Sequence, residues 1–103
     1  MSQVACKITR VKQLTSSVRQ LILEVPSSQV SKVKFTPGQW VDFWPPKVEN
    51  PGGFSISSAP GNLPQIELAI RDSPHPVVKW IHSENCKEGS SVKEGLTNIL
   101  LKS

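Results

Sequence analysis

Short turns rich in proline and glycine divide this sequence into brief segments, and this punctuation limits what the chain can fold into. Nine prolines and six glycines are spread over its 103 residues. Proline interrupts a central strand because it lacks an N–H, and glycine accepts turn conformations with positive φ. The apolar runs between the turns are only a few residues long, which excludes a transmembrane helix. We therefore expect short elements joined by tight turns.

Most segments between these turns alternate apolar and polar residues, a period of two that is typical of half-buried strands. Strands are predicted over residues 4–8, 21–25, 40–44, 54–58 and 66–71. The polar connection over residues 27–36 is expected to carry a single turn. Residues 91–93 are compatible with a last strand, and residues 96–100 with a helical turn or an irregular tail.

One short helix is predicted over residues 76–85. Proline suits its first turn, where the missing N–H is not needed. Val77, Trp80 and Ile81 fall at i, i+3 and i+4 and form a short apolar stripe. Five or six short strands followed by one helix favour a β-sandwich or a closed antiparallel barrel.

Composition and charge argue against several classes of function. Hydrophobic residues make up 37% and charged residues 19%, which is typical of a globular domain rather than a disordered chain. The net charge of +4 is scattered without a basic block, so it favours solubility over nucleic-acid binding. Two cysteines are too few for a disulfide framework or a structural zinc site. The first residues do not resemble a secretory signal.

The sequence is also poor in acid–base and nucleophilic groups. His75 and His82 are its two histidines, and its eight acidic residues form no obvious pair. It contains no nucleophile elbow, phosphate-binding loop or dinucleotide-binding fingerprint. Cys6 lies in an apolar alternation and is expected in the core, whereas Cys86 lies in a polar stretch and is expected to be partly exposed. Redox chemistry would therefore require a cofactor.

Two segments together carry a resemblance to a known family. Residues 37–41 read Pro-Gly-Gln-Trp-Val, and residues 53–60 read Gly-Phe-Ser-Ile-Ser-Ser-Ala-Pro. From about residue 4 to residue 92 the chain resembles the FAD-binding domain of the ferredoxin–NAD(P)+ reductase flavoprotein superfamily. The resemblance implies an all-β fold, a six-stranded antiparallel Greek-key barrel with one short helix, formed as a single domain over residues 1–103.

The resemblance also implies cofactor-binding positions, and it implies no catalytic residue and no metal ligand. Phe54 would lie against the flavin ring, and Ser55 would hydrogen-bond near flavin N5. The alternatives for these two residues are a core phenylalanine and a solvent-facing strand serine. The backbones of Ile56 and Ser57 would lie along the cofactor, and that of Ile70 would lie beside the pyrimidine end of the ring. The full set of implied positions is Gly52, Gly53, Phe54, Ser55, Ile56, Ser57, Ile70, Pro76, Val77 and Val78.

Residues 76–78 match the family's phosphate-binding helix start, where free N–H groups and the helix dipole attract an anion. Two positions depart from the family's pattern. Gly52 stands where the family has a phosphate-pairing arginine, and Val78 stands where it has a serine. The neighbouring Gly53 would let the backbone approach a phosphate closely. Other sources of positive charge nearby in the sequence are Arg71, His75 and Lys79.

The resemblance implies a flavin (FAD)-binding domain of an NAD(P)H-dependent oxidoreductase, in which hydride passes from nicotinamide to flavin N5. The family's second, NAD(P)-binding domain is absent from these residues, so we expect no hydride transfer by this chain alone. Its expected partners are the flavin and, in a longer protein, that second domain. Family resemblance further implies a mitochondrial location.

Two other functions stay open at this point. One is a degenerate, non-catalytic β-barrel that acts as a binding or regulatory module, which Gly52 and Val78 favour. The other is an unrelated small barrel that binds, for example, oligonucleotides. That function requires a basic face with exposed aromatic residues. The three tryptophans have core-like neighbours such as Val41 and Phe43, which disfavours it.

Overall fold

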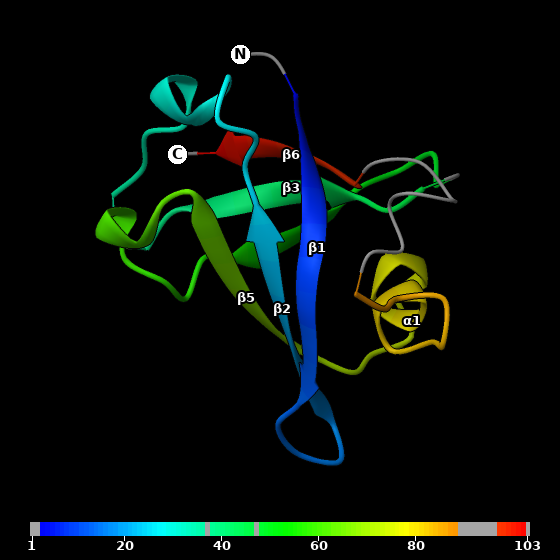
Figure 1. Cartoon of the computed structure of the whole chain (residues 1–103). Coiled ribbons are helices and arrows are strands. Elements are labelled where there is room, and N and C mark those ends of the chain that lie inside the picture. Colours follow the sequence, from blue (N-terminus) through cyan, green and yellow to red (C-terminus); the bar gives the residue numbers. More distant parts are fainter. Residues whose placement is uncertain (1–2, 37, 47, 89–96, 103) are drawn as a thin grey trace.

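The computed structural model describes residues 3–36, 38–46, 48–88 and 97–102. Pro37 of the Pro-Gly-Gln turn and the optional strand at residues 91–93 lie outside the described residues. Within the described part the strands are β1 (Val4–Gln13), β2 (Val18–Glu24), β3 (Trp40–Trp44), β4 (Gly52–Ser55), β5 (Gln65–Arg71) and β6 (Thr97–Lys102) (Figure 1). The helical segments there are α1 (Pro76–Ile81) and the 3-10 turns η1 (Val30–Lys32) and η2 (Pro60–Asn62). Turn η1 confirms the single turn predicted between the second and third strands.

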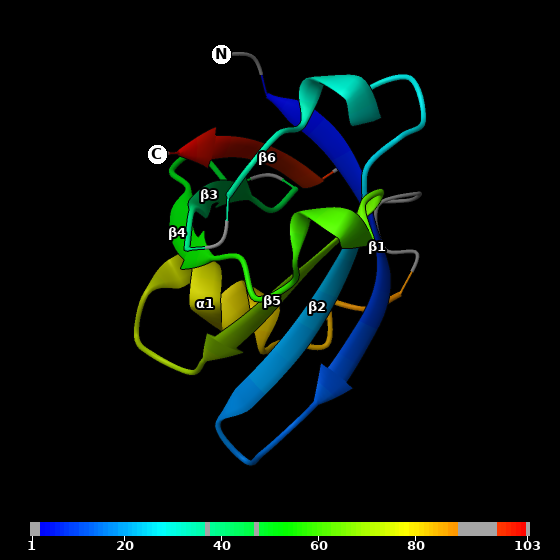
Figure 2. The same cartoon turned by 90° about the vertical axis from the view of Figure 1, so that its left-hand side faces the viewer.

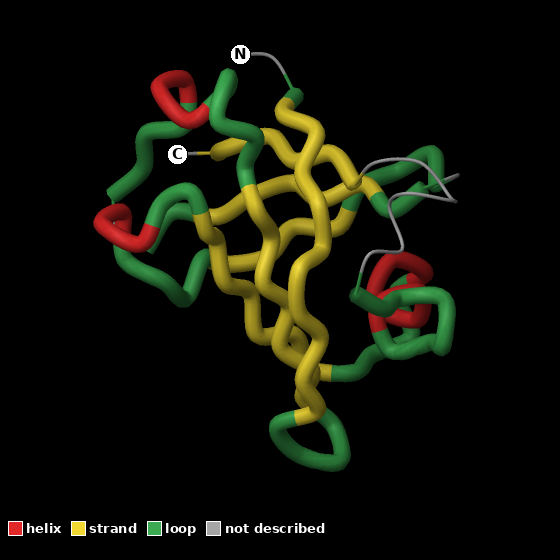
Figure 3. The backbone as a smooth tube through the Cα atoms, in the orientation of Figure 1, coloured by secondary structure: helices red, strands yellow, loops and turns green. Residues whose placement is uncertain are grey.

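Six antiparallel strands form one sheet in the order β4-β3-β6-β1-β2-β5 (Figure 2). Strands such as β2 and β3 follow each other in the chain but are not neighbours in the sheet, which is Greek-key connectivity. The two edge strands meet through an isolated bridge between Ile56 and Leu68. The sheet thereby curls into a barrel, as the backbone trace shows (Figure 3). The predicted six-stranded antiparallel Greek-key barrel with one short helix is confirmed.

Alternate side chains of the strands fill the barrel, as the period of two requires. The large side chains buried there include Ile8, Leu21, Leu23, Phe43, Ile66, Leu68, Ile70 and Ile99. Helix α1 adds Val77, Val78 and Ile81 to the same core. Cys6 is fully buried, which confirms its predicted place. Among the described residues, no helix has the length and apolar character needed to cross a membrane.

The helix predicted over residues 76–85 is too long, because α1 ends at Ile81. Arg19 Nη1 donates hydrogen bonds to the carbonyl oxygens of Ile81 (3.0 Å) and Ser83 (3.1 Å). Ser83 Oγ donates to the carbonyl of Trp80 at 2.6 Å. Side chains thus satisfy carbonyl groups that a further helical turn would have used.

The helical turn or irregular tail predicted over residues 96–100 is wrong for the described residues, which belong to β6. This strand lies between β1 and β3. Ile99 pairs with Val4 on one side and with Phe43 on the other. Pairing with a strand on each side favours the extended conformation of these residues over a helical one. The local sequence pattern does not contain these long-range pairings.

Two smaller predictions also need correction. The strand predicted over residues 54–58 begins and ends earlier, because β3 pairs Phe43 with Gly52 and the chain leaves the ladder after Ser55. Cys86 was expected to be partly exposed, but it is only 3% exposed. The loop after α1 turns back through a hydrogen bond from the Cys86 N–H to the carbonyl of Ser83, and the thiol packs against the core.

Leu68 provides a test of the barrel closure, because it is fully buried where β5 meets Ile56. The Leu68→Ala substitution is expected to lower the free energy of unfolding by about 2–5 kcal/mol, since it leaves a cavity. Urea unfolding followed by circular dichroism measures this change. The exposed neighbour Ala69 is the control, and Ala69→Ser should change stability by less than about 0.5 kcal/mol. Equal effects of the two substitutions would contradict the placement of Leu68.

The two buried thiols predict a loss of stability at alkaline pH. Burial raises the pKa of Cys6 and of Cys86 from 9.0 to about 12. The stabilising contribution is therefore fully present below pH 9 and is lost as the pH rises towards 12, because the thiols of the unfolded chain ionise first. The urea midpoint should fall over this range, and it should fall less in the Cys6→Ala/Cys86→Ala variant. A thiol reagent used below pH 9 should label the unfolded chain much faster than the folded one.

Candidate functional site

The outward face of the β3–β4 pair presents an exposed aromatic side chain beside an exposed hydroxyl. Trp40 is directly opposite Ser55 in the ladder, and its side chain is 42% exposed. Both residues face away from the core, because the neighbouring Val41 is fully buried. A Cβ atom placed on Gly53 would lie 3.7 Å from Trp40 Cδ1, so the indole lies next to backbone that carries no side chain. This face offers an aromatic surface, a hydroxyl and the exposed backbone of Gly53, and it also carries Asp42, whose Oδ1 is 3.8 Å from the Cβ position of Gly53.

Phe54 lies on the opposite, inward face of the same strand. It pairs with Val41, and its ring meets that of Phe43 edge-to-face with the centroids 6.0 Å apart. The side chain is partly buried against the core. Phe54 is therefore part core residue and part surface residue, and its predicted role at the flavin ring stays a prediction.

Gly52 lies in a close-packed place between Phe54 and the start of α1. A Cβ atom on Gly52 would lie 2.9 Å from Phe54 Cζ and 3.0 Å from Val77 Cγ1. Such contacts are too short for any side chain without movement of its neighbours. The glycine is therefore required by the packing of the phenylalanine ring and of the helix around it.

Ile56 and Ser57 follow β4 and join the two edges of the sheet, which closes the barrel. This contact between the two edges is called the seam. The N–H of Ile56 donates to the carbonyl of Gln39 at 3.0 Å, and the N–H of Ser57 donates to the carbonyl of Glu67 at 2.8 Å. Ser57 Oγ lies 3.0 Å from both the carbonyl oxygen and Oε1 of Glu67. The backbone amides of both predicted site residues thus already have acceptors within the protein.

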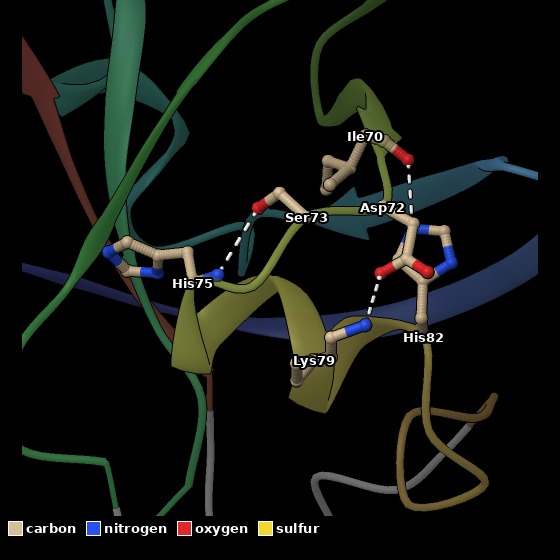
Figure 4. A network of polar contacts seen from close by, with 6 residues as sticks. All are labelled: Ile70, Asp72, Ser73, His75, Lys79 and His82. Atoms are coloured by element: carbon tan, nitrogen blue, oxygen red, sulfur yellow. Dashed lines mark hydrogen bonds and ion pairs between the residues drawn. The ribbon is translucent and has the colours of Figure 1, made fainter.

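The first turn of α1 has little free hydrogen-bonding capacity. Pro76 has no N–H, and the N–H of Val77 donates to Nδ1 of His75 at 3.2 Å. The N–H of His75 in turn donates to Ser73 Oγ at 3.3 Å (Figure 4). Of the three helix-start residues predicted to bind phosphate, this leaves the amide of Val78, whose side chain is buried.

Ile70 and the charged residues after it form a second polar region (Figure 4). The carbonyl of Ile70 lies 3.0 Å from His82 Nε2, which must be the donor because a carbonyl only accepts. Lys79 Nζ pairs with Asp72 Oδ1 at 3.1 Å, and this hydrogen bond lowers the pKa of Asp72. Arg71 is exposed at the end of β5. The carbonyl of Ile70, one of the main-chain groups predicted to lie beside the flavin ring, is therefore engaged by His82.

The structure separates the predicted site residues into several places. Gly52, Phe54 and Val77 are in close proximity, Gly53 and Ser55 face outward, and the remaining positions lie at the seam or at the helix start. Sequence reasoning missed Trp40. Its outward direction follows from the burial expected for Val41 and Phe43, so the alternation could have identified it.

A separate, open depression of about 470 Å³ lies beyond the end of α1. Its lining consists of Val11, Arg19, Ser83, Glu84, Cys86, Lys87 and Glu88. It shares no residue with the predicted cofactor positions. No group of three metal-ligating side chains occurs in the part of the chain that the structure describes.

Comparison of the fold with solved structures identifies barrels of the same kind. A ferredoxin reductase of carbazole 1,9a-dioxygenase superposes with a TM-score of 0.72 at 20% identity, over 98% of this chain and 28% of that one. A siderophore-interacting protein from Acinetobacter baumannii superposes with a TM-score of 0.69 at 15% identity, over 100% of this chain and 42% of that one. The chain is thus a ferredoxin-reductase-type barrel.

Comparison of sequences gives a more specific relationship. The chain is 40% identical over 95 residues to the Danio rerio protein named Oxidoreductase NAD-binding domain-containing protein 1, and 42% identical over 82 residues to the Homo sapiens protein of that name. These matches cover 89% and 77% of the chain. No family model matches. The chain is homologous to one part of these proteins, and it spans 34% and 25% of their lengths.

The close packing at Gly52 makes a measurable prediction. Gly52→Ala is expected to cost about 1–3 kcal/mol in stability, because the new methyl group overlaps the Phe54 ring and Val77. Gly61→Ala is the matched control, since nothing lies within 4 Å of its Cβ position. Thermal or urea unfolding measures both changes.

A double-mutant cycle identifies the neighbour responsible. Removing the ring in Gly52→Ala/Phe54→Ala should recover part of the cost of the Gly52 substitution, so the two changes should not be additive. Additive effects would show that Phe54 is not the side chain that restricts the size of the residue at position 52.

Proposed function

We propose that this chain binds a flavin, with FAD as the expected cofactor, and that it is the flavin domain of an NAD(P)H-dependent oxidoreductase. The observation that carries the proposal is the outward face of the β3–β4 pair, where the exposed indole of Trp40 lies beside Ser55 and the backbone of Gly53. The barrel fold and the homologues named for an oxidoreductase support it.

The residues of this face suit a planar ring. The indole of Trp40 offers a flat apolar surface, and the hydroxyl of Ser55 can donate a hydrogen bond to a ring nitrogen. Gly53 adds no side chain to this face, and the Trp40 indole lies over it, 3.7 Å from its Cβ position. On the core side of the strand pair, the rings of Phe43 and Phe54 pack edge-to-face. A bound flavin would supply the redox chemistry by accepting hydride at its N5 atom.

In this proposal the nicotinamide site belongs to a second, NAD(P)-binding domain outside the 103 residues. Support comes from the name of the homologues, which refers to an NAD-binding domain, and from their greater length. This chain alone is then not expected to transfer hydride. The mitochondrial location implied by family resemblance stays a prediction.

A non-catalytic barrel that acts as a binding or regulatory module is the second candidate. The observation that favours it is the packing of Phe54 and Val77 around Gly52, which leaves no room for a side chain that could contact a cofactor. The two functions predict different results for one direct measurement, which is whether the folded chain binds a flavin.

Titration of the chain with FAD, followed by quenching of flavin fluorescence and by co-elution in gel filtration, tests the proposed function. Trp40→Ala is expected to weaken binding about fivefold, since loss of an aromatic contact costs about 1 kcal/mol. Ser55→Ala should also weaken it. Leu14→Ala is the control, because Leu14 is similarly exposed (44%) but lies at the β1–β2 turn. A folded chain that binds neither FAD nor FMN would favour the non-catalytic module.

A further inference from the structure

Exposed cations and an exposed leucine lie together where the β1–β2 hairpin projects beyond the rest of the barrel (Figures 1 and 2). We propose that this hairpin surface, defined as Arg10, Lys12, Leu14, Val18 and Arg71, docks the chain on an anionic lipid surface. It is separate from the outward face of the β3–β4 pair, where the flavin is proposed to bind. Lipid docking is therefore a second interaction, beyond the proposed function.

The strand register brings the five residues to one end of one face. The N–H of Leu14 donates to the carbonyl of Val18 at 2.9 Å, and Val18 pairs with Arg71 at the end of β5. In β2 the buried side chains alternate with outward ones, and Val18 belongs to the outward set. Lys12 and Arg10 of β1 pair with other outward residues of β2. The surface thus combines three cations with two apolar side chains.

The three cations are available to a ligand. Arg10, Lys12 and Arg71 are exposed, and among the described residues their side chains make no hydrogen bond or ion pair. The carboxylate next to them in sequence, Asp72, is paired with Lys79 at 3.1 Å, so those two charges offset each other. The end of the hairpin therefore carries uncompensated positive charge.

Two further carboxylates border the surface without covering it. Glu88 Oε1 accepts a hydrogen bond from the N–H of Val11 at 3.4 Å, on the edge of β1 that faces away from β2, and the exposed Lys87 precedes it. Glu67 lies near the other end of β5, where its Oε1 accepts a hydrogen bond from Ser57 Oγ at 3.0 Å. On this face positive charge is therefore concentrated towards the hairpin tip.

Leu14 adds an apolar contact at the tip itself. Its side chain is 44% exposed. The turn that follows is closed by Thr15 Oγ1, which accepts hydrogen bonds from the N–H groups of Ser17 at 3.2 Å and Val18 at 3.0 Å. The leucine is therefore presented on an ordered turn. An apolar side chain flanked by Lys and Arg suits the boundary between lipid headgroups and acyl chains.

This geometry fits a lipid surface better than an acidic protein. A projecting hairpin presents a narrow surface, whereas a stable protein interface needs roughly 800 Å² from each partner. A lipid surface requires no matching shape, and each Lys or Arg near it strengthens binding about fivefold. The three cations together predict a preference of about a hundredfold for anionic over neutral lipid. Such binding is weak and reversible.

Sedimentation with vesicles tests the proposal. The folded chain is mixed with vesicles of phosphatidylcholine alone, or with about one-third phosphatidylserine, at low and at high salt. We expect binding to the anionic vesicles to be about a hundredfold stronger at low salt and to be lost at high salt, because added ions screen exposed charges. Equal binding to both compositions, or no binding to the anionic vesicles at low salt, would overturn the proposal.

A pair of double variants separates the hairpin surface from net charge. Lys12→Gln/Arg71→Gln is expected to weaken binding to the anionic vesicles about 25-fold. Lys32→Gln/Lys34→Gln removes the same charge in and just after η1, at the opposite end of a molecule 33 Å long. Because this exceeds the Debye length of about 10 Å, the second variant should change binding by less than about twofold. Equal losses would show that net charge alone decides, and would overturn the proposal.

The leucine gives an independent measurement of orientation. Leu14→Ala should weaken vesicle binding about threefold, since less apolar surface is inserted. Leu14→Trp places a fluorophore at the tip, and brominated lipid should quench it. Equal quenching of the wild-type chain, whose tryptophans include the exposed Trp40, would show that another face contacts the lipid and would overturn the proposal. Flavin binding should be unchanged in all hairpin variants, so either proposal can fail while the other stands.

Discussion

The architecture depends on how Ile56 joins the two edges of the sheet. Its N–H donates to the carbonyl of Gln39, the residue before β3, while its backbone bridges to Leu68 of β5 and its side chain is buried. The next residue, Ser57, continues the connection to Glu67. This short seam converts an open sheet into a barrel and leaves few unpaired edges. It also sets which faces of β4 point inward and outward, and the candidate site follows from that.

The local pattern predicted the strands that alternate strictly, because burial of one face of a sheet imposes a period of two. It failed where a partner distant in sequence decided the conformation. Residues 97–102 become a strand because β1 and β3 flank them, and the helix stops at Ile81 because Arg19 reaches its end. Cys86 is buried because the loop folds back onto the core, which its polar neighbours in sequence do not indicate.

The candidate site was predictable in its segment but not in its details. The motif pointed to the strand pair that carries the candidate site, yet it could not show that the amides of Ile56 and Ser57 are used to close the barrel. Nor could it show that Phe54 packs partly inward while Trp40, from the neighbouring strand, presents the exposed ring. These assignments depend on the register of β3 against β4, a long-range property that composition and spacing do not contain.

Positions 52, 54 and 77 form one packing unit, so none of them can be interpreted alone. An inward phenylalanine at 54 requires a glycine at 52, because a Cβ atom there would overlap both the ring and Val77. A cation at position 52 would in turn require a smaller or outward-pointing residue at 54. Gly52 therefore reflects the packing of the core, as well as being a departure from the family's pattern at the candidate site. Because this packing occupies the inward face of β4, the proposed function assigns the flavin ring to the outward face, where Trp40 and Ser55 are paired across the β3–β4 ladder.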